Sequence, residues 1–257
     1  MKYIPPVQNV SFVMIKLLFF IHFIPINAQN EALTPTKIEA YYLKNNKKDI
    51  QSVSEGTVSN GKLLHAKLIP FQGSNFQYFD TTSYLKGRAY TNSQLEKTVL
   101  ETYAAFETTI PKRTFFIMEC SNKHGGKMYP HRTHQNGLSI DFMMPLQKSG
   151  TPYYNLDTIG ASHYWLNFDD EGNYSKDTSV TIDFELVARH ILMLDAKARS
   201  NGLKIAKVII KTELKDELYQ GEFGQQLKNS GIYLVKKLTP LINSLHDDHY
   251  HIDFVFL

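Results

Sequence analysis

The sequence predicts an α+β fold, a mainly antiparallel central sheet with flanking helices, in one domain over residues 51–257. Short apolar segments typical of strands alternate there with two longer segments whose apolar residues recur at helical spacing. The chain ends in a further strand, expected at 249–256. Strands and helices interleaved in this way favour helices packed on an antiparallel sheet. An apolar content of 42% over 257 residues suffices for one sizeable core.

The first part of the domain combines a hairpin arm with a helix. Residues 54–61 are rich in turn formers, and the apolar residues at 63–69 indicate a short strand or hairpin arm. A helix is expected from Asn92, because Asn92 or Ser93 can cap its first turn. The apolar residues that follow near helical spacing are Leu95, Val99, Leu100, Tyr103 and Phe106.

Two buried strands are expected next. The apolar run at 113–120 favours the first, and Gly125-Gly126 then interrupts the chain. The second is expected at 138–144 and contains Asp141. Cys120, the single cysteine, ends the first run, so a disulfide within the chain is impossible and a buried core position is expected.

The last part of the domain begins with a long connection. Residues 146–182 are loop-like, and a connection of this length is often functional. A helix is expected from its N-cap Asp183 to Gly202, with His190 on its apolar face as a core residue. A strand is expected at 205–210, followed by helical or irregular segments before the terminal strand.

The N-terminal residues indicate export. Residues 1–28 resemble a secretory signal peptide, because Lys16 precedes an apolar run at 17–26 and Ala28 offers a small residue at a cleavage point. The run is too short to span a bilayer comfortably, although an uncleaved anchor is an alternative. No other membrane segment is expected. Residues 29–50 are polar and are expected to form a flexible or lightly structured lead-in.

The charge balance gives no support for nucleic-acid binding. Removing residues 1–28 takes away Lys2 and Lys16 and no acidic residue, so 26 basic residues remain against 25 acidic ones. A nucleic-acid-binding protein needs a basic surface, which this balance does not favour.

Two histidine-rich segments, 124–134 and 246–251, contain six of the ten histidines. Imidazole and carboxylate are ligand types that Zn²⁺ accepts. In a strand, residues i and i+2 face the same side, so His249 and His251 share a face. One of them can bind a metal while the other handles a proton. Asp247 or Asp248 can orient a histidine through its second ring nitrogen.

The first segment supplies two further ligand candidates, His134 and Asp141, seven residues apart. This spacing suits a loop that bends back onto the following strand, and Gly137 relieves the bend. Three ligands, His134, Asp141 and His251, leave one tetrahedral position open for water, as in catalytic zinc sites. A Gly-x-Ser-x-Gly elbow and a phosphate-binding glycine loop are absent from the sequence, so a serine hydrolase or nucleotide enzyme is disfavoured.

The pattern resembles the metallopeptidase group that includes lysostaphin, D-Ala-D-Ala dipeptidases and carboxypeptidases, and the hedgehog signalling domain. Within it, the chain is most similar to the penicillin-insensitive murein endopeptidases. The similarity covers most of the domain and includes Ser59-Asn60-Gly61 with Leu63, Arg88-Ala89-Tyr90, Gly125-Gly126, His131-x-x-His134-x-x-Gly137-x-x-x-Asp141, Val208-Ile209-Ile210 and His246-x-x-His249-x-His251. The chain departs from the enterobacterial relatives, which contain disulfides, and the segment 146–182 does not align.

The resemblance implies a zinc peptidase fold of the hedgehog and D-Ala-D-Ala peptidase type, with Zn²⁺ bound by His134, Asp141 and His251. It implies that His249 is the catalytic base or stabilises the transition state, and that His246 lines the site as a second catalytic residue that can stabilise the oxyanion. His131 would line the site or help hold a second metal. Arg88 would bind a substrate carboxylate, unless it forms only a surface salt bridge.

The expected function is that of an exported, penicillin-insensitive zinc endopeptidase that hydrolyses D,D or L,D cross-links between peptidoglycan stem peptides. The expected location is the periplasm or the outside of the cell. Two alternatives remain open: a D-Ala-D-Ala carboxypeptidase or dipeptidase with the same metal site, and a non-catalytic zinc-bearing binding module.

Overall fold

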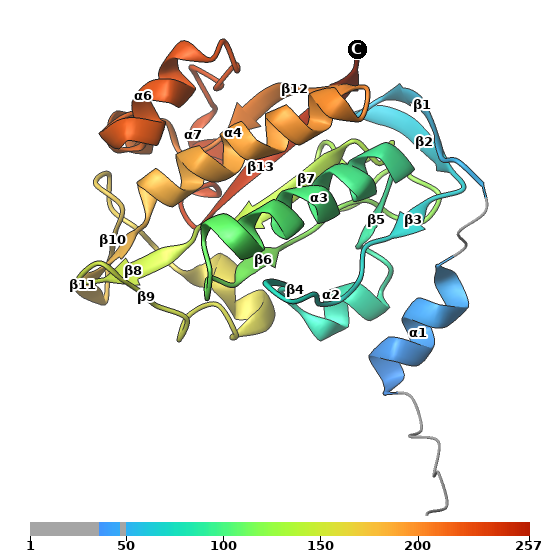
Figure 1. Ribbon diagram of the computed structural model, residues 1–257, viewed down its shortest axis with the longest axis horizontal. Coiled ribbons are helices and arrows are strands. Elements are labelled where there is room, and N and C mark those ends of the chain that lie inside the picture. The colour runs from blue at the N-terminus through green and yellow to red at the C-terminus, as the bar shows by residue number, and fades with distance from the viewer. Residues whose placement is uncertain (1–35, 47–49) are drawn as a thin grey trace, which may run out of the picture. The chain divides into compact units, whose positions relative to one another are not determined.

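A five-stranded sheet forms the centre of the protein in this computed structural model, which describes residues 36–46 and 50–257 (Figure 1). The strand order is β12-β13-β7-β6-β4. Every neighbouring pair is antiparallel except β4 and β6, which run parallel. The strands are β4 (Phe76–Tyr78), β6 (Phe115–Ile117), β7 (Ser139–Met143), β12 (Leu203–Ile209) and β13 (His249–Phe256). The mainly antiparallel sheet predicted from the sequence is thus confirmed.

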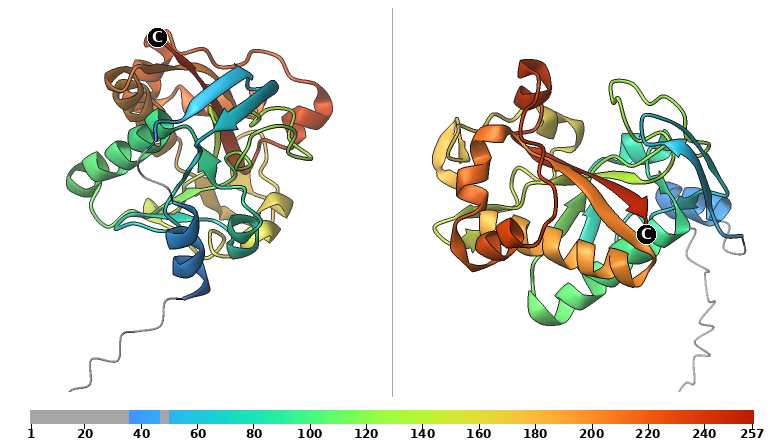
Figure 2. Two further views of the ribbon diagram at one scale, coloured as in Figure 1. Left: turned by 90° about the vertical axis from the view of Figure 1, so that its right-hand side faces the viewer. Right: turned by 90° about the horizontal axis from the view of Figure 1, so that it is seen from above.

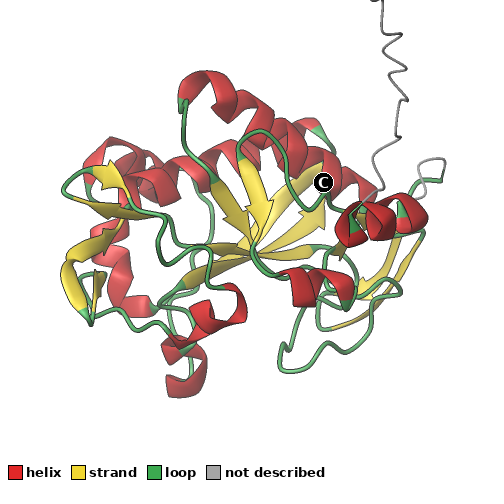
Figure 3. Cartoon of the chain, turned by 90° about the horizontal axis from the view of Figure 1, so that it is seen from below, coloured by secondary structure: helices red, strands yellow, loops and turns green. Residues whose placement is uncertain are grey.

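Two long helices cover one face of this sheet (Figures 1 and 3). They are α3 (Ser93–Thr109) and α4 (Phe184–Ser200), and both were predicted. The side chain of Asn92 caps α3 by accepting from the Gln94 amide, and that of Asp183 caps α4 by accepting from the Leu186 amide. Their apolar faces are buried, as helices packed on a sheet require.

Strand alternation divides the residues of β7 and β13 between the two faces of the sheet. These strands pair in register, with Asp141 opposite His251 and Ile140 opposite Ile252. Apolar residues such as Phe142 and Tyr250 face the helices and contact His190 of α4. Asp141, His249 and His251 therefore lie together on the opposite face. Figure 2 shows β12 (orange) beside β13 (red), which continues to the C-terminus.

The segment 146–182 is more ordered than the sequence indicated. It contains β8 (Leu146–Lys148), β9 (Thr151–Pro152), the 3-10 helix η1 (Gly160–Trp165), β10 (Asn173–Tyr174) and β11 (Asp177–Ile182). The strands form a separate sheet with the order β10-β11-β8-β9. Val180 and Ile182 alternate inward on β11 and are buried, which stabilises a strand within a polar stretch. The prediction that residues 146–182 form a loop is therefore wrong where these strands and the 3-10 helix occur.

Smaller elements complete the domain. On the N-terminal side they are β1 (Val53–Thr57) and β2 (Asn60–Leu64), which form a hairpin, β3 (Lys67–Leu68) paired with β5 (Tyr90–Thr91), and α2 (Thr81–Leu85). On the C-terminal side they are η2 (Thr212–Leu214), α5 (Lys215–Leu218), α6 (Gly221–Asn229) and α7 (Pro240–Ser244). These last four occupy the region expected to be helical or irregular.

Part of the predicted lead-in is helical. α1 (Lys37–Asn45) begins with a capping box, in which Thr36 accepts from the Glu39 amide and Glu39 accepts from the Thr36 amide. The predicted signal peptide at 1–28 lies outside the described residues. Within 36–46 and 50–257, no helix has the length and apolar character needed to cross a bilayer.

Candidate metal centre

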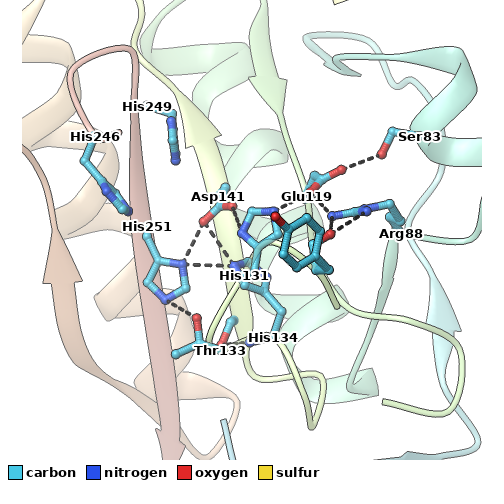
Figure 4. Close-up of polar contacts among 12 residues, drawn as sticks. Ser83, Arg88, Glu119, His131, Thr133, His134, Asp141, His246, His249 and His251 are labelled. Atoms are coloured by element: carbon cyan, nitrogen blue, oxygen red, sulfur yellow. Dashed lines mark hydrogen bonds and ion pairs between the residues drawn. The ribbon is translucent and has the colours of Figure 1, made fainter. Parts of the chain in front are cut away.

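Three donor atoms from the two histidine-rich segments converge on the polar face of the sheet (Figure 4). The Nδ1 atom of His251 lies 2.7 Å from Asp141 Oδ1 and 3.1 Å from His134 Nε2, and His134 Nε2 lies 3.2 Å from Asp141 Oδ1. Donors around a tetrahedral zinc ion lie roughly 3.4 Å apart, given bonds of about 2.1 Å. The three atoms therefore need to separate by about 0.2–0.7 Å to hold such an ion.

The donor set fits a metal ion in burial as well as in spacing. His134 is fully buried, and Asp141 and His251 are almost so. Asp141 Oδ2 has no hydrogen-bond partner among the described residues, and it lies 3.5 Å from His131 Nδ1. Donor atoms of His131, His134 and Asp141 all lie within 4.8 Å of one another, which is compatible with metal binding. A buried carboxylate among imidazoles is costly unless it is paired or bound to a metal.

The turn that presents His134 depends on local backbone geometry. Gly137 has a φ of +79°, and a Cβ atom there would lie 2.7 Å from the Leu63 side chain and 2.9 Å from the Asn92 amide. The predicted role of Gly137 in bending the loop agrees with this conformation. His134 also has a positive φ, +66°, which non-glycine residues rarely adopt.

His251 is oriented by a carboxylate that the sequence analysis missed. Asp253 Oδ1 accepts from His251 Nε2 at 2.7 Å, which leaves Nδ1 facing Asp141. Asp253 in turn accepts from Ser139 Oγ at 2.5 Å and pairs with Lys207 Nζ at 3.0 Å. Burial lowers the pKa of His251, but the carboxylates of Asp253 and Asp141 outweigh it and raise this pKa to about 10. Carboxylate–histidine pairs of this kind commonly fix the tautomer of a metal ligand.

His249 lies beside the cluster and is paired with Asp248. The distance from His249 Nδ1 to Asp248 Oδ1 is 2.6 Å, and both side chains are buried. Burial lowers the pKa of His249, but the Asp248 carboxylate raises it above the ordinary value. Asp247 or Asp248 was predicted to orient a histidine, and in the structure Asp248 pairs with His249.

His246 has the opposite electrostatic character. Its ring centroid lies 4.9 Å from that of His249, and its Nδ1 donates to the Ile242 carbonyl at 2.6 Å. Burial and the neighbouring His249 lower its pKa to about 3, so it stays neutral. Figure 4 shows His246, His249 and His251 on the same side of Asp141. A neutral and a basic imidazole thus lie next to each other at the cluster.

Glu119 connects His131 to Arg88 on the other side of the cluster (Figure 4). Its Oε2 lies 2.5 Å from His131 Nε2 and 2.6 Å from Arg88 Nη2, and its Oε1 accepts from Ser83 Oγ at 3.0 Å. Burial raises the pKa of Glu119, but His131 and Arg88 hold it below the usual range. The guanidinium of Arg88 also donates to the Tyr129 carbonyl. A substrate contact of Arg88 stays a prediction.

Neither Glu119 nor Asp253 was predicted from the sequence as a neighbour of the site. One signal for Glu119 was present, since it is the single polar residue in an otherwise apolar run at 115–120. For Asp253, the signal was its position two residues after His251 on the same strand face.

A buried His/His/Asp cluster on an α+β scaffold is typical of metal-dependent hydrolases. Comparison with protein families agrees, because residues 54–255 match the penicillin-insensitive murein endopeptidases, and the chain belongs to this family. A search of curated proteins found no match. The chain is therefore a metallopeptidase that acts on peptidoglycan, as the sequence resemblance implied.

Proposed function

We propose that the protein is an exported zinc endopeptidase that hydrolyses D,D or L,D cross-links between peptidoglycan stem peptides. The observation that supports this most is the convergence of His134 Nε2, Asp141 Oδ1 and His251 Nδ1 in a chain of the murein endopeptidase family. We assign these three residues as the zinc ligands. Bound Zn²⁺ supplies Lewis acidity and lowers the pKa of a bound water toward ~7.

His249 is the proposed proton carrier. Asp248 orients its ring and favours its protonated form, so His249 can take a proton from the attacking water and deliver it to the leaving amine. The neutral His246 lies against it and can contact the substrate without adding charge. His131, held by Glu119, lines the cluster and is placed to assist a second metal. Arg88 remains the candidate for a substrate carboxylate.

Zinc content and product analysis test this proposal. The variant His134→Ala should lose zinc and release cross-linked muropeptides from purified sacculi on the order of 10³-fold more slowly, since a Lewis acid supplies several kcal/mol of transition-state stabilisation. His124→Ala is the matched control, because His124 is an exposed histidine near the same turn. Full activity of His134→Ala would refute the ligand assignment.

The products separate the proposed reaction from its enzymatic alternative. An endopeptidase converts cross-linked dimers into monomers, whereas a carboxypeptidase or dipeptidase releases D-Ala or its dimer. Mass spectrometry of digested sacculi measures both. Free D-Ala without loss of cross-links would reassign the reaction while leaving the metal site in place.

A further inference from the structure

Tyr164 of η1 packs against His249 beside the metal centre, although the segment 146–182 had no assigned role. Its ring lies edge-on to His249, with centroids 5.5 Å apart, and edge-on to Phe79, with centroids 5.6 Å apart. His249 begins β13, and Phe79 directly follows β4. The strands between these two in the sheet are β7, which contains Asp141, and β6, which leads to Glu119. The Tyr164 ring thus bridges the strands that supply the site.

The hydroxyl of Tyr164 is buried without a hydrogen-bond partner among the described residues. An unsatisfied buried polar group costs about 1–3 kcal/mol, so native proteins rarely keep one without a reason. Burial raises the pKa of this hydroxyl well above its usual range, and the carboxylates of Glu119, Asp141 and Asp248 raise it further. The phenol is therefore a neutral donor at physiological pH, close to the carboxylates of the site.

Three contacts fix η1 and the residues next to it in this position. The ring nitrogens of His163, which is fully buried, lie 2.9 Å from the Leu156 carbonyl oxygen and 3.2 Å from that of Asp248. Farther along, Asp247 accepts from the Phe168 amide at 3.0 Å. Because Asp247 and Asp248 directly precede His249, the segment that presents Tyr164 is fastened to the strand that presents the proton carrier. These contacts hold the Tyr164 ring against His249.

We propose that Tyr164 is a further catalytic residue, whose hydroxyl donates a hydrogen bond to the oxygen that gains negative charge as water adds to the scissile carbonyl. The proton stays on Tyr164, so no group is transferred and the charge balance is unchanged. This role rests on the proposed peptidase function. Since the hydroxyl has no partner within the described chain, its hydrogen bond is gained on the way to the transition state, which is the condition for an effect on kcat.

The variant Tyr164→Phe tests this role, because it keeps the ring that packs on His249 and Phe79 and removes only the hydroxyl. Removing one such donor typically costs about 10²–10³ in kcat. We expect a loss of this size on a cross-linked muropeptide dimer, with nearly unchanged KM, zinc content and pH profile. A shifted pH profile would mean that Tyr164 acts through His249, which would overturn the direct contact. A change in KM alone would overturn it as well.

A binding measurement complements the kinetics. A phosphinic pseudopeptide of the D-alanyl cross-link imitates the tetrahedral oxyanion, and calorimetry gives its affinity for the zinc-loaded protein. Tyr164→Phe should weaken this affinity by a factor similar to the loss in kcat. Tyr154→Phe is the matched control, because the Tyr154 hydroxyl lies in the same segment but bonds to Lys112 and Thr114. It should leave both readouts unchanged.

The two proposals fail in distinguishable ways. If the wild-type enzyme resolves cross-links and Tyr164→Phe matches it in kcat and in phosphinate affinity, only the role of Tyr164 is refuted. If the wild-type protein neither cleaves the dimer nor binds the phosphinate, the proposed function is refuted, and the role of Tyr164 with it.

Discussion

Along β7 and residues 249–254 of β13, both faces of the central sheet are buried, but they are chemically opposite. On β7 and β13, the residues that face α3 and α4 are apolar or aromatic: Ile140, Phe142, Tyr250 and Ile252. Those on the other face are polar except Met143, which lies opposite His249: Ser139, Asp141, His249, His251 and Asp253. Apolar burial stabilises the fold, whereas polar burial costs free energy unless each group finds a partner. The same two strands thus provide a core on one face and a reactive cluster on the other.

One buried histidine on each face shows how the two environments change the pKa of an imidazole. His190 packs among aromatic rings, including Phe115 and Phe142, and its Nδ1 accepts from the Tyr250 hydroxyl at 2.5 Å. Burial lowers the pKa of His190 to about 3, whereas the carboxylates around His251 raise that pKa to about 10. Burial alone therefore keeps an imidazole neutral, and adjacent carboxylates are needed to make it basic. The prediction that His190 is a core residue is confirmed.

The largest expected effect comes from disrupting the polar face at the proton carrier. His249→Gln removes general acid–base catalysis, which typically contributes 10²–10⁴-fold, so kcat should fall by about that factor. Zinc content should be retained, because His249 is not among the three proposed ligands. Steady-state kinetics on a muropeptide dimer, together with metal analysis, measure both quantities.

The adjacent residue provides the matched control for that variant. Tyr250→Phe alters the other face of the same strand by removing the hydroxyl that donates to His190. It should reduce the free energy of unfolding by about 1 kcal/mol and leave kcat unchanged. If Tyr250→Phe reduced kcat as strongly as His249→Gln, the two faces would not be functionally separate.

A smaller effect is expected from the carboxylate behind His251. Asp253→Asn removes the charge that holds His251 Nε2, and losing such a partner typically weakens metal affinity 10–100-fold. Competition with a chromogenic chelator measures the zinc affinity. Asp177→Asn serves as control, because Asp177 pairs with Lys148 at an exposed position. Equal affinities for the two variants would exclude a role of Asp253 in metal binding.

The sequence was most informative where function follows from local spacing. Strand alternation placed His249 and His251 on one face, and the distance from His134 to Asp141 predicted a loop that returns onto its strand. Both inferences use only neighbouring residues, and the structure brings all three proposed ligands together. The capped helices α3 and α4 were likewise predictable, because their periodicity and caps are local signals.

Contacts between distant segments could not be predicted in this way. β8 pairs with β11 across a separation of about thirty residues, so no local sequence pattern identifies which strand each of them pairs with. Glu119 meets His131 and Arg88 only because three separate segments fold together. Tyr164 belongs to the same class, since its position depends on contacts of its neighbour His163 with the terminal strand region.

The smallest expected effect concerns the stability of the apolar face and its dependence on pH. The folded-state pKa of His190, about 3, lies below the unfolded value of ~6.5, so the unfolded state binds a proton that the folded state excludes. The contribution of the neutral His190 to the free energy of unfolding is complete above pH ~6.5 and is lost as the pH falls toward 3. Each pH unit in this window costs up to about 1.4 kcal/mol.

His190→Phe isolates this contribution, because phenylalanine fills an aromatic site and does not titrate. At pH 7.5 the variant should be less stable than wild type by about 1 kcal/mol, since the Tyr250 hydroxyl loses its acceptor. At pH 5.5 the wild type has lost about 1.4 kcal/mol that the variant keeps, so the difference should vanish or reverse. Urea unfolding at both pH values measures it, with the exposed His124→Ala as the control that shows no such shift. An unchanged difference would mean that His190 is not held neutral by its aromatic surroundings, and the contrast between the two faces would lose its electrostatic basis.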